Sequence, residues 1–359
     1  MTTKLPHKNC FAARRIAGFT LIELMIALLV SLIILGALSV VYSSAFRTNR
    51  FQDGLQRLNE NGRYALELMA RDIRMAGYYG CAEDKDPMDA AGPVFSGVTT
   101  AGGNSAFVTM PIHGFEHSTS GANAVWHPTD IDYEANPVAA TNSDAIIVRL
   151  SQPLNTSSGN SAEVSSNMGS TLSAISVDDA SEVSAGDPMI IGNCENADIF
   201  IATAVAGNSI THQTVVTPTD GLENAADSLT AAYETNADIY NFFSIRYDVQ
   251  ADNSNGGIPT LYRKVNMANP EPLVPGVENM QILYGEDTGG RESPDVYRSA
   301  ADVVNWPLVR TVKIALLLRT EDEFGDEALD GSEASTYDLA GFSFADDTLA
   351  CDVVSLKPL

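Results

Sequence analysis

Three histidines have the spacing in this chain that comes closest to a metal site. His113, His117 and His127 form the pattern His-x3-His-x9-His, which would offer imidazole ligands to zinc. The region around them has no helical periodicity, and no carboxylate stands at the spacing found in zinc peptidases. We therefore interpret them as solvated loop histidines, and the sequence predicts no metal site there.

Two acidic segments carry oxygen ligands of the kind that calcium prefers. Asp248, Asp252, Asn253 and Asn255 precede a pair of glycines, but they do not fit EF-hand spacing. A hairpin turn is the simpler interpretation of this segment. No cofactor is predicted, with calcium left open as an alternative. The second segment is predicted to be a solvated loop, and its acids are Glu321, Asp322, Glu323, Asp326, Glu327, Asp330 and Glu333.

Motifs that carry catalysis are absent from the sequence. It contains no nucleophile elbow, no phosphate-binding loop and no His-Glu-x-x-His pair. The 21 Lys and Arg residues stand against 46 Asp and Glu, and the net charge of −25 would repel a nucleic-acid backbone. The sequence therefore predicts neither an enzyme nor a nucleic-acid-binding protein.

One carboxylate stands where a charge is costly. Glu23 is followed by an uncharged run from residue 24 to residue 46, and the next charge is Arg47. A helix over this run would be about 35 Å long, enough to cross a hydrocarbon core of about 30 Å. A charge at such a place costs roughly 2.5 to 3.5 kcal/mol and by default marks a functional residue with a partner. Glu23 is therefore the strongest candidate site residue.

The element that positions Glu23 is predicted to be a helix that crosses a membrane once. The positive-inside rule places residues 1–18 in the cytoplasm and the remaining chain across the membrane. A secretory signal peptide cut near residues 43–45 is one alternative. Signal peptides have apolar cores of only about 7 to 15 residues, which is shorter than the run from residue 24 to residue 46. A plain membrane anchor is the other alternative, and it leaves Glu23 unexplained. The basic residues before the run are Lys4, Lys8, Arg14 and Arg15.

The junction between the basic residues and the apolar run resembles that of the type IV pilin family. The motif is Gly18-Phe19-Thr20-Leu21-Ile22-Glu23, with the acid at the fifth position after the glycine. The resemblance implies that a prepilin peptidase removes residues 1–18 as a leader, cutting between Gly18 and Phe19, and methylates the new amino group of Phe19. It also implies pairing of that ammonium with the Glu23 carboxylate of a neighbouring subunit, so that neither charge is stranded.

The helix is predicted to continue beyond the membrane. Apolar and small residues recur there at intervals of three or four positions, which is typical of one helical stripe. Gly77 is the predicted stop. The sequence thus predicts a helix over residues 19–76, with residues 19–46 in the membrane and a stripe beyond them that packs on the protein's own sheet. The stripe is Phe51, Leu55, Leu58, Gly62, Ala65, Met69 and Ile73.

Residues 77–359 are predicted to form a periplasmic head rich in β-structure. Apolar and polar residues alternate over residues 243–249, which predicts an antiparallel sheet with one face in solvent. A long helix packed on such a sheet is an α+β fold. Residues 86–143 and 151–170 are predicted to be long surface loops or an insertion. The predicted strands are 145–150, 189–191, 199–205, 239–249, 259–265, 277–284 and 309–319.

Four further stretches carry a more specific resemblance. They are residues 61–67 (NGRYALE), 70–81 (ARDIRMAGYYGC), 192–200 (GNCENADIF) and 273–280 (LVPGVENM). They resemble the PilW-like minor pilins of the type IV pilus, and the J-type pseudopilins of type II secretion are similar too. The resemblance implies a low-abundance structural subunit that primes pilus assembly with other minor pilins, the major pilin and a large adhesin-like tip protein. It would sit at or near the tip of the extracellular pilus and support adhesion and twitching motility.

Two alternatives and one departure from the family accompany this interpretation. The chain could instead be a minor pseudopilin of a type II secretion system, or a tip-located adhesin module that binds a surface through residues 86–143. The family pattern leads to a basic final strand, whereas residues 346–359 begin with two aspartates and end in Leu-Lys-Pro-Leu. The sequence therefore leaves the last strand in doubt.

The cysteines are the remaining candidates for chemistry. Cys10 lies in the leader, and Cys81, Cys194 and Cys351 would lie in an oxidising periplasm. The resemblance favours a disulfide between Cys81 and Cys194, because both lie in family-like stretches. Closing so long a loop would stabilise the fold by about 4 to 5 kcal/mol in the chain-entropy model. Pairing of Cys194 with Cys351 is the alternative.

Overall fold

The computed structural model divides the chain into two units, Met1–Asp53 and Gly54–Leu359. It describes residues 20–80, 94–100, 110–116, 143–156, 161–214, 222–235, 237–266, 268–291, 293–320, 335–339, 342–346 and 353–356.

The predicted long helix is present as α1 (Leu21–Arg74), which contributes residues to both units. Its first turn carries an acid and its last turn carries Arg71 and Arg74, so the side-chain charges oppose the helix dipole at both ends. The chain turns away at Gly77, whose φ of 78° is a left-handed conformation. A Cβ at that position would lie 3.0 Å from Pro111 Cγ. Gly77 as the helix stop is therefore confirmed.

The predicted stripe of α1 is buried in the second unit. Leu58, Gly62, Ala65 and Met69 are buried, and Leu55 and Ile73 are half-buried. Phe51 belongs to the first unit and is 49% exposed. The prediction that the stripe packs on the protein's own sheet is confirmed from Leu58 onward.

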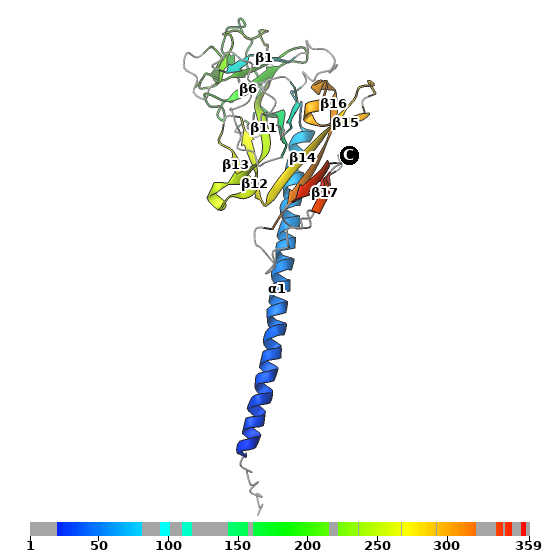
Figure 1. The fold of residues 1–359 in the computed structure, drawn as a ribbon. Helices are drawn as coiled ribbons and strands as arrows, with labels where there is room; N and C mark the ends of the chain where they lie inside the picture. The colour runs from blue at the N-terminus through cyan, green and yellow to red at the C-terminus, as the bar shows by residue number, and fades with distance from the viewer. Residues whose placement is uncertain are drawn as a thin grey trace, which may run out of the picture. The chain divides into compact units, whose positions relative to one another are not determined.

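The largest sheet of the head has eight strands, and one strand holds it together. That strand, β11 (Asp238–Asp252), pairs along one edge with β4 (Ala145–Pro153) and along the other with β6 (Pro188–Gly192) and then β12 (Ile258–Val265). All its pairings are antiparallel, and Figure 1 shows it running between the two ends of the head. The remaining strands of this sheet are β1 (Val94–Ser96), β3 (Ile112–Phe115), β7 (Ala197–Ile201) and β13 (Glu271–Pro275).

A second sheet has four strands in the order β15-β14-β16-β19, where β15 is Val296–Arg298, β14 is Val277–Glu286, β16 is Val309–Leu318 and β19 is Val353–Leu356. The start of β4 joins it to the first sheet. Met280 N–H donates to Ser143 Oγ over 3.0 Å, and Ile282 N–H donates to Asp144 Oδ2 over 2.8 Å. The final strand that the sequence left in doubt is present as β19, which pairs antiparallel with β16.

Smaller elements complete the head. Three short strands form a separate sheet, and two further pairs stand alone. The three are β5 (Ile175–Ser176), β9 (Ser209–Thr211) and β8 (Ala204–Ala206); the pairs are β2 (Val98–Thr100) with β10 (Leu222–Asn224) and β17 (Ser335–Leu339) with β18 (Phe342–Asp346). The 3-10 turns are η1 (Asn253–Asn255), η2 (Ala300–Asp302) and η3 (Trp306–Leu308).

Five of the seven predicted strands lie within single observed strands, a sixth, 309–319, extends one residue beyond β16, and the seventh is split. Residues 199–205 belong to β7 and β8, with a break at Ala202 and Thr203. The chain changes partners there, because Ala202 N–H donates to Asp187 and Thr203 N–H donates to Thr211. A change of hydrogen-bond partner leaves no mark on hydrophobic periodicity, so the sequence could not reveal the break.

The prediction that one face of the main sheet is wet is wrong for β11. Ser244, Arg246 and Asp248 are buried, although they alternate with the apolar residues. Arg246 Nε lies 3.1 Å from Asp248 Oδ1, and Gln250 donates to the other carboxylate oxygen over 2.6 Å. These contacts supply the partners that buried charges need, so a polar face can also be covered.

The head contains two large apolar cores. The first lies between α1 and both large sheets and includes residues of β4, β11, β12, β13, β14 and β16. The second lies around β5, β6, β7 and β9 and includes Leu154, Ala162, Val164 and Met168. Residues 151–170 therefore contribute to a core, so the prediction of a surface loop there is wrong. The alternative prediction, an insertion, agrees with the second core. In residues 86–143 the described part forms β1, β2 and β3.

One buried polar contact fixes α1 on the head, and the sequence analysis missed it. Asp72 is 6% exposed and accepts a hydrogen bond from the Tyr247 hydroxyl over 2.6 Å and from Arg263 Nη2 over 3.2 Å. Arg263 Nε also donates to the Tyr247 oxygen over 3.1 Å. Burial, followed by the Asp72 carboxylate, raises the pKa of Tyr247, so its hydroxyl remains a donor. The contact links the last turn of α1 to β11 and β12.

We expect Asp72→Asn to lower the free energy of unfolding of the head by about 1 to 3 kcal/mol, because the amide keeps the shape but leaves Arg263 without its counter-charge. Urea unfolding of the detergent-solubilised full chain, followed by fluorescence of Trp306 in η3, measures this. Glu60→Gln changes an exposed acid of the same helix and should stay within about 0.5 kcal/mol. Equal effects of the two substitutions would contradict a special role for Asp72.

Candidate functional site

Glu23 begins α1 and is held by the residue just before the helix. Thr20 N–H and Thr20 Oγ1 both donate to Glu23 Oε2, over 3.3 Å and 3.2 Å, and Glu23 N–H donates back to Thr20 Oγ1 over 3.3 Å. This reciprocal pattern is a capping box, with Thr20 as N-cap and Glu23 three residues into the helix. It satisfies backbone donors that the first turn of a helix otherwise leaves without partners.

The capping box gives Glu23 a local structural role beside any role in assembly. All three hydrogen bonds lie within one chain and use only one of the two carboxylate oxygens. The other oxygen, Oε1, accepts no hydrogen bond from the described residues, and Glu23 is exposed. The carboxylate can therefore remain fixed to its own helix and still accept a donor from another molecule. The spacing Thr-x-x-Glu before an apolar run was the signal in the sequence that could have predicted this.

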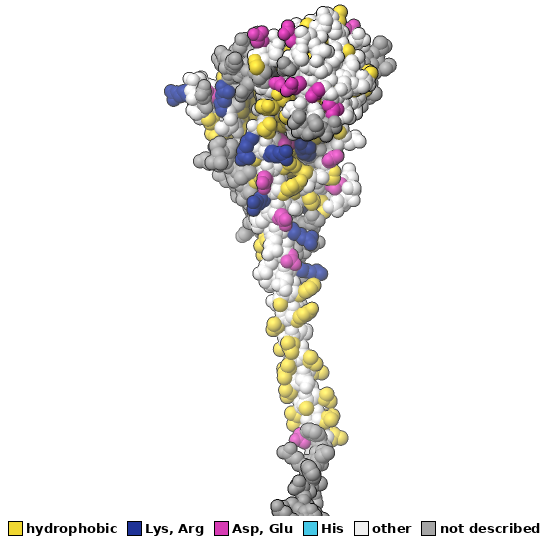
Figure 2. Space-filling view, turned by 180° about the vertical axis from the view of Figure 1, so that it is seen from behind, with side chains coloured by type: hydrophobic (Ala, Val, Ile, Leu, Met, Phe, Trp, Pro, Cys, Tyr) yellow, Lys and Arg dark blue, Asp and Glu magenta, His cyan; other side chains and the backbone are white. Residues whose placement is uncertain are grey.

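The helix after Glu23 presents apolar side chains on every side. It is long and apolar enough to cross a membrane. Its most apolar stretch has a mean hydropathy of 2.9, and no residue of that stretch is buried within the protein. Figure 2 shows hydrophobic side chains around this part of α1. The Ser31 hydroxyl donates to the carbonyl of Ala27 over 2.7 Å, so that polar group is satisfied within the helix. This surface suits lipid or a bundle of similar helices.

The apolar segment ends where aromatic and basic side chains meet. The Arg50 guanidinium lies over the ring of Phe46, 4.6 Å from its centroid, and Tyr42 stacks on the same ring at 6.4 Å. Aromatic rings and basic side chains are typical of the boundary between a bilayer and water. These side chains lie at the predicted end of the membrane-spanning part near residue 46, and that end stays a prediction.

The cysteine prediction is left open by the structure. Cys194 is exposed and forms no disulfide with any residue that the structure describes. It lies in a tight turn in which the Asn193 side chain accepts hydrogen bonds from the backbone N–H groups of Glu195 and Asn196. Cys81 and Cys351 lie outside the described residues, as do Gly18 and Phe19. The disulfide and the cleavage site therefore stay predictions.

The residues considered as metal ligands are dispersed or have structural roles. His113 packs between Phe115 and Trp306, with ring centroids 5.0 Å and 4.6 Å away. Asp252 caps η1, accepting from Ser254 N–H over 2.9 Å, and Asp248 pairs with Arg246. His117, His127 and the acidic segment 321–333 lie outside the described residues. Within the part of the chain that the structure describes, no three His, Cys, Asp or Glu side chains are placed to hold a metal ion.

We expect Thr20→Val to fray the start of α1, because valine cannot accept the Glu23 N–H or donate to its carboxylate. An N-cap is worth about 1 kcal/mol, so exchange of the Glu23 amide, which donates to Thr20 Oγ1, should become about fivefold faster. Hydrogen exchange followed by NMR in detergent micelles measures this. Thr20→Ser keeps the hydroxyl and is the matched control. Exchange as slow in the valine variant as in the serine variant would refute the capping role.

Comparison with known protein families agrees with this geometry in two separate parts of the chain. Residues 13–39 match the prokaryotic N-terminal methylation motif, and residues 246–349 match the type IV pilus-assembly protein W family, PilW. The first match contains the capping box and the start of α1, and the second runs from within β11 to beyond β18. Neither a curated protein nor a solved structure matches the chain significantly. The methylation motif on an apolar helix and the PilW match over strands of the head together support a type IV pilin-like protein of the PilW family.

Proposed function

We propose that the protein is a minor pilin that helps to prime assembly of the type IV pilus and sits at or near its tip, where it supports adhesion and twitching motility. The observation that carries this proposal is Glu23, a lone carboxylate at the start of an exposed apolar helix. A charge in that position is costly unless a partner neutralises it, and assembly supplies the partner. The function is structural, with no catalytic step.

The chemistry of the partner follows from cleavage between Gly18 and Phe19. Cleavage creates an ammonium at Phe19, and the same apolar helix bundle that surrounds Glu23 would surround it. Glu23 Oε2 is held by Thr20 while Oε1 is open, so the carboxylate can accept that ammonium from a neighbouring subunit without breaking the capping box. A pair of opposite charges in a low dielectric is favourable only with good geometry, which the cap provides.

The charge of the head supports a subunit present in few copies. Ten of the 21 basic and five of the 46 acidic residues precede Gly77, which leaves 11 basic and 41 acidic residues and a net charge of −30 beyond it. Many such heads side by side would repel one another. A tip position, where one or a few copies suffice, avoids this repulsion. The partners we propose are other minor pilins, the major pilin, an adhesin-like tip protein and the prepilin peptidase.

The proposed location follows from the orientation of the helix. Before assembly, α1 crosses the inner membrane with residues 1–18 in the cytoplasm and the head in the periplasm. After assembly, the helix leaves the bilayer for the interior of the pilus and the head becomes extracellular. An apolar surface on every side of the helix suits both environments.

Processing can be measured directly. We expect the intact mass and N-terminal sequence of the membrane-bound protein to show a chain starting at methylated Phe19 in cells with the prepilin peptidase. Cells without the peptidase should contain a chain starting at Met1. A chain starting at Met1 in both strains would identify an uncleaved anchor, and a start near Phe46 a secreted domain; either result would overturn the proposed function.

The role of Glu23 in assembly can be separated from its role in the membrane. We expect Glu23→Ala to remain in the membrane but to enter pili at least about tenfold less, because the incoming ammonium loses its counter-charge. Quantitative immunoblots of sheared pili against membranes measure this. Glu60→Ala, an exposed acid of the same helix, is the control. Wild-type incorporation of Glu23→Ala would contradict the proposal, and loss of exoprotein secretion with intact pili on deletion would assign the chain to a secretion system.

A further inference from the structure

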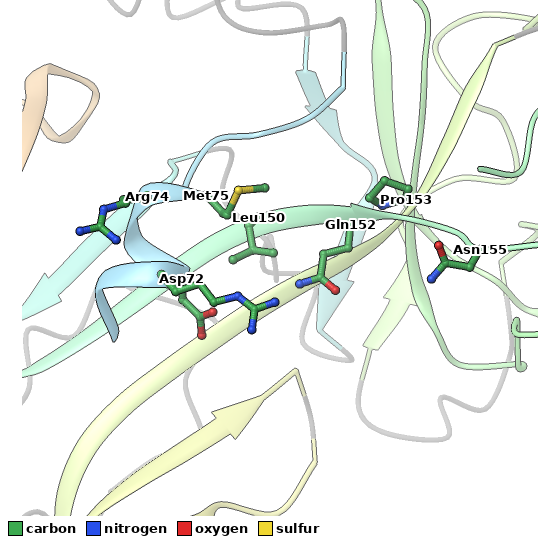
Figure 3. A pocket seen from close by; sticks show the side chains of 8 residues that line it. Asp72, Arg74, Met75, Leu150, Gln152, Pro153 and Asn155 are labelled. Carbon is green, nitrogen blue, oxygen red and sulfur yellow. The ribbon is translucent and has the colours of Figure 1, made fainter. Parts of the chain in front are cut away.

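An open pocket of about 430 Å³ lies beside the last turn of α1. Figure 3 shows residues of that turn, Asp72, Arg74 and Met75, on one side, and Leu150, Gln152 and Pro153 of β4 on the other. Arg71 and Asn155 complete the lining. All eight residues belong to the second unit, so that unit alone forms the pocket.

The pocket carries two positive charges that no acidic side chain among the described residues neutralises. Arg71 and Arg74 are exposed and form no ion pair with the residues that the structure describes. The Asp72 carboxylate, although it lines the pocket, is engaged by Tyr247 and Arg263. Glu67, one turn earlier on α1, has its carboxylate 3.9 Å from Arg63 Nε. With respect to the described residues, two guanidinium groups therefore remain available, on a protein whose chain beyond Gly77 carries a net charge of −30.

The helix dipole explains why Arg71 and Arg74 are positively charged, but it does not explain the exposed side chains near them. Arginines in a last turn stabilise the carbonyl end of a helix. Beside them, however, Met75 is 38% exposed and Tyr78 is 41% exposed, and Pro153 is exposed as well. Arg71, Arg74 and Met75 line the pocket and Tyr78 follows them in the chain, and exposed Arg, Met and Tyr side chains are enriched in protein–protein interfaces. The patch has the features of a docking surface.

We propose that this pocket binds an acidic segment from the head of a neighbouring pilin-like subunit, with carboxylates paired to Arg71 and Arg74 and an apolar side chain packed on Met75. The inference rests on the proposed function, since it requires neighbours in a pilus. Charge complementarity selects the occupant, because an acidic segment meets attraction here and repulsion over most of a head with net charge −30. A second copy would bring a head of equal negative charge, so a different subunit is the partner.

The test places a photo-crosslinking amino acid at exposed Gln152 in the full-length chain in piliated cells and identifies the crosslinked peptide by mass spectrometry. Leu172, which is 54% exposed and does not line the pocket, is the control position. We expect Gln152 to crosslink to a peptide with at least two Asp or Glu residues from another pilin-like subunit. A neutral or basic peptide, a peptide from a second copy, or no adduct would overturn the inference.

Substitutions then test the charges themselves. Arg71→Glu with Arg74→Glu should reduce the yield of this adduct about five- to tenfold, because attraction becomes repulsion. Arg71→Lys with Arg74→Lys should retain most of it. Arg63→Glu changes an exposed arginine of the same helix outside the pocket and is the matched control. An unchanged adduct in the double glutamate variant would overturn the inference.

Two further measurements keep the result interpretable. Arg71→Gln with Arg74→Gln is a milder change, and the melting temperature of each variant shows whether the head is folded. If Phe19 is processed and the wild-type chain enters pili while the charge variants crosslink normally, only the docking inference fails. If the wild-type chain is neither processed nor found in pili, the proposed function fails and the inference fails with it.

Discussion

The structure depends on one helix that must satisfy two different solvents. Up to residue 46, α1 is apolar on every side and satisfies its backbone groups within itself, which a bilayer requires. From Leu58 onward only one stripe is apolar, and the head encloses that stripe. The positions of the sheets follow from this constraint, because β4, β11, β14 and β16 all contribute side chains to the core around the helix.

Apolar burial and directional contacts have separate roles in holding the helix. The stripe supplies most of the attraction, but hydrophobic burial has little directional preference and would tolerate sliding of a helix along a sheet. The Asp72 carboxylate accepts hydrogen bonds from two strands at once, so it fixes the register of the last turn. The left-handed turn at Gly77 follows directly, and Gly77 N–H donates to the carbonyl of Arg149 in β4 over 2.9 Å. The apolar stripe, the Asp72 hydrogen bonds and the turn at Gly77 thus together define where the helix ends.

The parts of the fold that could be predicted from the sequence are those governed by local periodicity. The spacing of Leu58, Ala65 and Met69 predicted the buried stripe, and the spacing around Glu23 predicted the start of the apolar run. The contact of Asp72 with Tyr247 and Arg263 joins residues 175 and 191 positions apart, and no local pattern encodes it. The alternation in β11 predicted a solvent-exposed face, and this prediction was wrong. Hydrophobic periodicity does not show that Arg246 and Asp248 have partners that allow them to be buried. The capping box is a different case, since its signal was local and was overlooked.

The two cores of the head differ in their relation to the helix. The first contains α1 and both large sheets, whereas the second, around Phe200 and Ile210, contains no residue of the helix. Substitutions at distant sites that share no contacts combine almost independently in their effect on stability. Sequence drift in the second core can therefore accumulate without loosening the attachment of the helix. The fold thus separates the core that attaches the helix from a second core that contributes no contact to that attachment.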